Sequence, residues 1–349
     1  MKKERSSNIE ILRILSMLMI IAFHWQLHGN NDGIIYSAFS SKQAFSFFWG
    51  SWGSLGVDIF FIISSFFGVQ SYSLKISRLV PIVVKVSLYG VFVLSCLNIF
   101  DLIDFNILET IKSFLGVFAY QYWFISVYVV LYCLHPALNK MMYFLSEKYF
   151  IFLVIVLFYS TYVIGFVYIN EFVGRLSCGI TIYLLVGFFY RFPKYNVFSN
   201  YGGWISLLGM SSICLGECFL SFLSLSYGQI FCSIINRIQI ITSPFMVIVA
   251  FGIFYRTLPL QRFHNNIINF LGKYSVGAYL LHGGSSSIKD VLWDDILNVA
   301  YFFNNTCTFV YVVYYIVCTF LFFFIGCIID FFVSIFVNKL IALFHREYN

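Results

Sequence analysis

The first long apolar segment, residues 9–28, contains side chains of the kinds that handle protons and anions. Glu10, Arg13 and His24 lie within it, and His28 ends it. If the segment is a helix, the eleven steps from Arg13 to His24 place both residues on one face, about 16 Å apart along the axis. Histidine can take a proton from a hydroxyl near neutral pH, and arginine can bind phosphate or carboxylate. The spacing therefore predicts a polar stripe that could position a bound anion and a reacting hydroxyl.

A simpler interpretation of this stripe stays open. Glu10 precedes Arg13 by three residues, a spacing at which an ion pair forms within one helix. Such a pair could do no more than orient the helix. His24 could likewise be a buried histidine that is hydrogen-bonded for structural reasons.

A second apolar segment, residues 53–70, contains a single acid, Asp58. Asp58 could orient a catalytic histidine, or it could pair with an arginine or lysine. Lys75 and Arg78 follow directly, three residues apart. They either anchor the chain at the cytoplasmic surface, where basic residues accumulate, or form a clamp for a phosphate-rich ligand.

Two later segments carry further polar side chains. Trp123 and Tyr128 are typical of the aromatic belt at a membrane surface, and they could also line a cavity. Ser275, Tyr279 and His282 follow an i, i+4, i+7 spacing, which gives them one helix face and indicates a second polar lining. The cysteines form no CxxC motif or Cys/His cluster, so we expect no metal site.

The composition indicates which elements must position these residues. Of 349 residues, 60% are hydrophobic, 21% aromatic and only 10% charged. That balance excludes a soluble enzyme, a disordered chain and a nucleic-acid-binding protein. Continuous apolar runs of about 20 residues favour membrane-spanning helices over a barrel. Ten such spans are predicted, at residues 9–28, 53–70, 79–100, 114–136, 150–169, 177–192, 203–223, 238–256, 267–284 and 308–337.

The basic residues predict the orientation of these spans, because lysine and arginine accumulate on the cytoplasmic side. With the N-terminus inside, thirteen fall on the cytoplasmic side: Lys2, Lys3, Arg5, Lys75, Arg78, Lys140, Lys148, Arg191, Lys194, Arg256, Arg262, Lys339 and Arg346. Five fall outside: Lys42, Lys112, Arg175, Arg237 and Lys289. We therefore expect an all-α polytopic bundle of about ten transmembrane helices with both termini cytoplasmic. We expect residues 1–349 to form one domain with no appended soluble domain.

Several of these motifs together resemble the membrane acyltransferase 3 family, which includes bacterial O-acetyltransferases of surface polysaccharides. The pieces occur in the family's order: Arg13-x10-His24 with an acid three residues earlier, GVDIFFIISSFFG (56–68), Lys75-x-x-Arg78, WFISVYVVLYCLHP (123–136) and KYSVGAYLLH (273–282). Three positions depart from the family pattern. The chain has Glu10 where aspartate is more common, Ser64-Ser65 in place of Ser-Gly, and Lys75 where arginine is usual.

The resemblance implies an activity and a role for each residue. An acyl group, usually acetyl, would pass from cytoplasmic acetyl-CoA to a hydroxyl of a cell-surface or capsular polysaccharide, or of its lipid-linked precursor. His24 would be the general base or would itself carry the acyl group. A neighbouring acid would orient it, for which Asp58 is the candidate, since Glu10 lies too deep. Arg13, Lys75 and Arg78 would bind the CoA phosphates.

The resemblance also implies the protein's surroundings and partners. It places the chain in the bacterial cytoplasmic membrane as a multi-pass protein. Its partners would be an acyl-CoA donor, a glycan acceptor and the lipid bilayer, with no nucleic acid and no bound cofactor, since acetyl-CoA is a co-substrate.

Two other kinds of membrane protein would also use polar stripes in a helical bundle. A transporter or flippase of lipid-linked sugars often shows internal repeats and matching broken helices. This chain has five prolines and no visible repeat. A polysaccharide polymerase would place a catalytic cluster in a large outer loop. Here the outer loops offer little beyond Asp290, Asp294 and Asp295.

Overall fold

The computed structural model describes residues 5–30, 33–34, 40–168, 171–227 and 230–347, and these residues form helices and no strand. Eight helical segments within them are long and apolar enough to cross a membrane: Ser7–Gly29, Ser41–Gly68, Ile76–Ile99, Trp123–Phe144, Glu147–Val167, Pro193–Ser224, Ile230–Thr257 and Thr308–Leu343. The predicted all-α polytopic bundle is therefore confirmed. The extreme termini, residues 1–4 and 348–349, lie outside the described part of the chain.

The remaining two predicted spans correspond to a single helix and a broken one. The span at 177–192 corresponds to α10 (Glu171–Arg191). The span at 267–284 is interrupted at Ser275, which separates α14 (Asn266–Tyr274) from α15 (Val276–His282).

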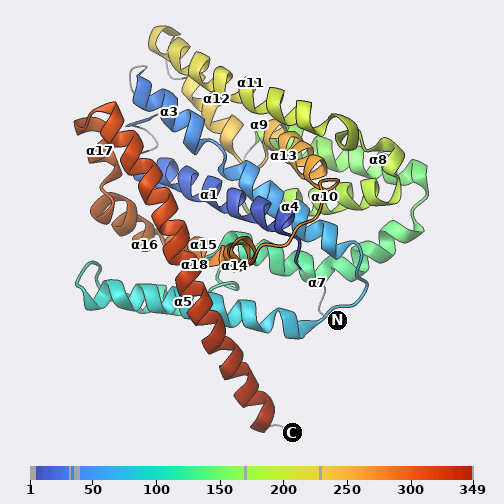
Figure 1. The fold of residues 1–349 in the computed structure, drawn as a ribbon, viewed down its shortest axis with the longest axis horizontal. Helices are drawn as coiled ribbons and strands as arrows, with labels where there is room; N and C mark the ends of the chain where they lie inside the picture. The colour runs from blue at the N-terminus through green and yellow to red at the C-terminus, as the bar shows by residue number, and fades with distance from the viewer. Residues whose placement is uncertain (1–4, 31–32, 35–39, 169–170, 228–229, 348–349) are drawn as a thin grey trace.

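Helices α1 (Ser7–Gly29) and α4 (Gly53–Gly68) lie antiparallel in the middle of the bundle (Figure 1). Glycine permits their close approach, because a Cβ atom on Gly56 would lie 2.5 Å from the carbonyl oxygen of Ser16. The central position of α1 means that its ionisable side chains are surrounded by protein. We call the side where α1 begins, at Ser7, the proximal side, and the side where it ends, at Gly29, the distal side.

Together with α10, the other helices of the membrane-spanning segments surround this central pair. They are α5 (Val80–Ile99), α7 (Trp123–Phe144), α8 (Glu147–Phe158) with its continuation through η2 (Tyr159–Ile164) and α9 (Gly165–Val167), α11 (Phe198–Tyr227), α12 (Ile230–Gln239), α13 (Pro244–Thr257) and α18 (Thr308–Glu347). The C-terminal part of α18 extends past the rest of the bundle (Figure 1). Several predicted boundaries are wrong. The span expected at 238–256 is interrupted at residues 240–243, between α12 and α13, and the span expected to end at 136 continues to Phe144 in α7. The span expected at 114–136 begins only at Trp123, and α18 continues ten residues beyond the predicted end at 337.

Short helices close the distal side. They are α3 (Ser41–Gly50), α6 (Ile107–Leu115), α16 (Ser286–Asp290), η4 (Val291–Ile296) and α17 (Val299–Asn305). Helix α6 explains why the 114–136 prediction started too early. Its apolar residues continue the hydrophobic run, but Gly116 and Tyr120 adopt positive φ values of 45° and 59° and interrupt the helix before α7.

The broken helix α14–α15 places His282 against α1. Ser275, at the break, is buried, and its hydroxyl donates to the carbonyl oxygen of Gly272 at 3.1 Å. Beyond the break, α15 packs closely on α18, because a Cβ atom on Gly277 would lie 2.4 Å from the carbonyl oxygen of Gly326. The last residue of α15 is His282, and it faces the distal half of α1.

Candidate active site

Two histidines from opposite ends of the chain meet at the distal end of α1. His24 Nδ1 lies 2.8 Å from His282 Nε2, and the ring centroids are 4.9 Å apart. His282 Nδ1 in turn lies 2.5 Å from the carbonyl oxygen of Ala278, one turn earlier on α15. His28 adds a third imidazole, with its centroid 5.1 Å from that of His24.

This chain of contacts assigns the protons on both neutral rings. A carbonyl oxygen can only accept, so His282 Nδ1 carries a hydrogen and donates it to Ala278. His282 Nε2 is then an acceptor, and His24 Nδ1 must donate to it. The nitrogen of His24 that keeps its lone pair is Nε2. The arrangement therefore prepares His24 Nε2 to accept a proton, with His282 as the positioning group.

His24 lines two cavities that meet at its side chain. The first, which we call the distal cavity, has a volume of about 850 Å³ and a largely polar wall. Its lining comes from α1, α6, the turn before α7, the start of α10 and the segment after α15. The polar residues on this wall are His24, His28, Asn106, Glu109, Lys112, Gln121, Arg175, Ser285, Ser286, Ser287 and Lys289.

The second cavity, which we call the apolar cavity, has a volume of about 440 Å³ and extends from His24 and Leu27 toward Ile20. It is bordered by the π-helical segment η2 and by the break between α12 and α13 at residues 240–243. Departures from α-helix inside a membrane occur where the backbone lines a cavity or is covered by protein. Arg175 lines both cavities, and its guanidinium carbon lies 4.7 Å from the ring centroid of Trp123.

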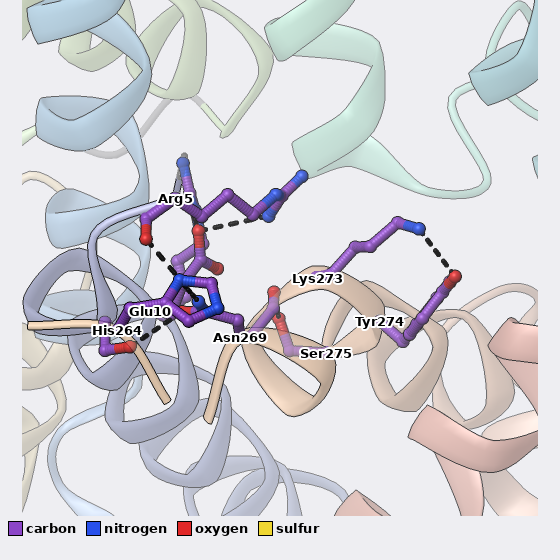
Figure 2. Close-up of polar contacts among 10 residues, drawn as sticks. Arg5, Glu10, His264, Asn269, Lys273, Tyr274 and Ser275 are labelled. Carbon is purple, nitrogen blue, oxygen red and sulfur yellow. Dashed lines mark hydrogen bonds and ion pairs between the residues drawn. The ribbon is translucent and has the colours of Figure 1, made fainter. Parts of the chain in front are cut away.

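The proximal end of the predicted stripe is organised around Glu10, whose side chain is only 2% exposed. Its Oε1 atom accepts from Arg13 at 2.5 Å and from Arg5 at 3.0 Å, so the ion pair suggested by the i, i+3 spacing is present. Figure 2 shows Glu10 and Arg5 beside residues of α14. A Cβ atom on Gly272 would lie 2.5 Å from Glu10 Oε2, so glycine at this position allows α14 to pack against the carboxylate.

Polar contacts join the start of α1 to α14 on this side. The Ser7 hydroxyl donates to Asn269 Oδ1 at 2.9 Å, and Asn269 Nδ2 also lies 3.0 Å from His264 Nδ1 (Figure 2). Lys273 Nζ donates to the Tyr274 hydroxyl at 2.6 Å. These contacts fix the proximal mouth of the stripe but do not extend to His24.

Lys75 and Arg78 lie exposed on the same side, in and next to the short helix η1 (Ile76–Arg78). Tyr128 interacts electrostatically with both Arg78 and Arg13, so the two arginines belong to one proximal region. Arg13, near the start of α1, and Arg78, in η1, thus lie on the same side of the bundle, and a shared anion site formed by them stays a prediction.

Asp58 has neither of the two partners that we expected. It is fully buried, and neither carboxyl oxygen has a hydrogen-bond partner or a cation among the residues that the structure describes. The reason is its depth. Gly56 contacts Ser16, so Asp58 lies near that level of α1, about 12 Å from the level of His24. The place beside His24 Nδ1 is occupied by His282.

The five predicted lining residues have different positions. Trp123 and Tyr279 line the distal cavity, and His282 contacts His24. Ser275 is buried at the helix break, and Tyr128 lies near the proximal arginines, so neither lines either cavity described above. No local pattern in the sequence indicates that Lys112, Arg175 and Lys289 line one cavity, because their side chains come from three separate elements.

Of three comparisons with known proteins, one identifies a family. No curated protein and no solved structure matches the chain. A family model described as an acyltransferase domain matches residues 6–331, which include α1, α4, α15 and both histidines of the pair. Since the match covers far more than half of the chain, this protein belongs to the membrane acyltransferase 3 family.

Proposed function

We propose that this membrane acyltransferase moves an acetyl group from cytoplasmic acetyl-CoA to a hydroxyl of a cell-surface or capsular glycan, or of its lipid-linked precursor. The observation that carries the proposal is the hydrogen-bonded chain from His24 Nδ1 through His282 to the Ala278 carbonyl oxygen. It leaves His24 Nε2 as the proton acceptor at the junction of a polar and an apolar cavity. A general base needs both an available lone pair and room for its substrate.

The reaction then follows from the position of His24. Its Nε2 atom removes the proton of the acceptor hydroxyl as the oxygen attacks the thioester carbonyl carbon. A carbon–oxygen bond forms, the carbon–sulfur bond breaks, and the CoA sulfur leaves with the electron pair. The proton held by His24 passes to that sulfur, which returns the imidazole to its neutral form. His282 stabilises the transient imidazolium by accepting from Nδ1 throughout.

The two cavities suit the two substrates. The distal cavity, with its polar wall, accommodates the glycan hydroxyl. The apolar cavity extends from His24 to Ile20, toward Arg13, and accommodates the thioester end of the donor. Arg13, Lys75 and Arg78 would hold the CoA phosphates at the proximal side, and the pantetheine arm would cover the roughly 16 Å between Arg13 and His24.

Replacing the base tests this proposal. We expect His24→Ala to abolish O-acylation of the surface glycan, because it removes the nitrogen that the His24–His282 contact leaves as the proton acceptor. Mass spectrometry of glycan from a deletion strain complemented with each variant measures the acyl content. Leu15→Ala is a matched control on the same helix, since Leu15 is 49% exposed on the outside of the bundle and should retain acylation. Wild-type acylation by His24→Ala protein, at equal membrane abundance, would contradict the role of base.

A further inference from the structure

The distal basic residues of the described chain fall into two groups, and the first group serves the fold. Lys42 Nζ donates to the carbonyl oxygens of Phe303 and Thr306, at 2.5 and 2.6 Å, at the end of α17. Arg237 Nη1 donates to the carbonyl oxygen of Phe166 at 2.7 Å, near the end of α9. Both cations satisfy carbonyl groups that have no further partner within their helices.

The second group comprises Lys112, Arg175 and Lys289, and all three line the distal cavity beside His24. They come from α6, α10 and α16, elements far apart in the sequence. Lys289 and His24 line the same cavity, so the ammonium charge of Lys289 lies on the wall of the space that His24 faces. Arg175 lies at the junction of the two cavities, over the ring of Trp123.

Orientation in the membrane does not explain this convergence. Basic residues on the predicted outer side oppose the usual charge bias of membrane proteins, so they need a local reason. Glu109 also lines the cavity, where one of its carboxylate oxygens accepts from the Ser287 hydroxyl at 3.1 Å, and the three cations outnumber this carboxylate on the wall. A concave site lined by several cations concentrates anions.

We propose that the acceptor carries a fixed negative charge, a carboxylate or a phosphate, which binds to Lys112, Arg175 and Lys289 while the hydroxyl lies at His24. This inference rests on the proposed function, since it names the class of acceptor at the same site. Arginine can bind such a group through two parallel hydrogen bonds, and the lysines add point charges. The anion belongs either to a sugar acid or to the phosphate that links a glycan to its lipid carrier.

Binding measured without turnover tests the inference separately from catalysis. The full chain with His24→Ala is placed in lipid nanodiscs, and the probe is unacylated surface glycan extracted from the deletion strain. The triple variant Lys112→Gln, Arg175→Gln, Lys289→Gln should weaken binding by at least about tenfold in calorimetry, as expected for the loss of charge-assisted hydrogen bonds. The charge-preserving triple Lys112→Arg, Arg175→Lys, Lys289→Arg should bind within a few-fold of the parent, and Lys42→Gln is the control for a distal cation outside the cavity.

Two treated glycans distinguish the sources of the charge. Carboxyl reduction removes sugar-acid charge, and mild acid removes the phosphate-linked lipid. One treatment should reproduce the loss seen with the glutamine triple. Three results would each overturn the inference. The glutamine triple and the charge-preserving triple could bind the glycan equally well. The untreated glycan and both treated glycans could bind equally well, or the untreated glycan could fail to bind. If glycan binding depends on the three cations but the wild-type chain transfers no acyl group, the proposed function is overturned. If the wild-type chain transfers the acyl group but glycan binding does not depend on the three cations, only the inference is overturned.

Discussion

His282 supplies to His24 what a carboxylate supplies to the histidine of many hydrolytic enzymes, a fixed acceptor on Nδ1. The two acceptors differ in charge, since a carboxylate is an anion and the His282 imidazole is neutral. A neutral imidazole anchored on the Ala278 carbonyl oxygen fixes the tautomer of His24 without placing an anion inside the membrane, where an unpaired charge is costly. We therefore expect His282 to have a positioning role in the proposed reaction, distinct from contact with substrate.

Substitutions of His282 separate positioning from packing. We expect His282→Ala to lower kcat for acyl transfer by about 100-fold, since His24 loses the partner that fixes its tautomer. His282→Gln should restore a large part of the rate, because a glutamine amide can donate to the Ala278 carbonyl oxygen and accept from His24 Nδ1. Transfer assays on purified protein measure both variants. Equal rates for the alanine and glutamine variants would show that the hydrogen bonds are not what matters.

For individual residues, the sequence predicted contacts within one helix but not contacts between distant helices. The Glu10–Arg13 contact follows from helix geometry, since residues three apart share a face. The His24–His282 contact joins residues 258 apart in the chain, and no periodicity can predict which helices become neighbours. Asp58 was the acid that the sequence suggested as a partner for His24, and the depth of Asp58 in α4 against α1 excludes that contact.

An ion pair between two neighbouring helices helps to hold α15 in place. Lys85 on α5 and Asp330 on α18 form a 3.0 Å ion pair, with Asp330 only 1% exposed, and Lys85 also donates to the Ser334 hydroxyl at 2.9 Å. A Cβ atom on Gly277 of α15 would lie 2.3 Å from the Cβ of Asp330. The ion pair therefore fixes α5 to α18 at the point where α15 crosses, and it indirectly supports the position of His282.

Removing one partner of this ion pair should destabilise the protein more than removing both partners. Lys85→Met leaves the buried Asp330 carboxylate without its cation, which we expect to cost about 3–5 kcal/mol if the group stays charged. The double variant Lys85→Met, Asp330→Asn should recover most of the loss in melting temperature in detergent. A double variant no more stable than the single variant would show that Asp330 does not depend on Lys85.

The apolar runs predicted most helices because hydrocarbon thickness sets their length. They did not predict the break at Ser275, which lies inside a run that reads as a continuous helix, or the separation of α6 from α7. Both features depend on the packing of neighbouring helices. Both also position the site, since α6 contributes Lys112 to the distal cavity and α15 ends at His282.

Across the whole molecule, two groups of cations lie on opposite sides, and each group belongs to one substrate of the proposed reaction. Arg13, Lys75 and Arg78 belong to the proximal side, and Lys112, Arg175 and Lys289 to the distal cavity. The charge bias of the loops assigns the proximal side to the cytoplasm, which stays a prediction. The arrangement implies that donor and acceptor approach from opposite sides of the membrane.

Membrane vesicles of defined orientation can test this division. Transfer should require acetyl-CoA on the side that carries Lys75 and Arg78. The double variant Lys75→Ala, Arg78→Ala should raise KM for acetyl-CoA by about tenfold, as for the loss of charge-assisted phosphate contacts, and leave KM for the glycan unchanged. Lys148→Ala, a proximal cation near the start of α8, is the matched control. Transfer driven by acetyl-CoA from the opposite side would contradict the predicted orientation.

His24 lines both cavities, and this has a consequence for the energetics of the membrane. In the proposed exchange an acyl group leaves the cytoplasmic side and a hydrogen atom leaves the distal side. Because one imidazole faces both spaces, the proton it takes from the hydroxyl can return to the departing sulfur without entering the distal solution. Each turnover then exchanges neutral groups and moves no net charge across the bilayer. The transmembrane voltage, worth about 2.3 kcal/mol per elementary charge at 100 mV, neither drives nor opposes the reaction.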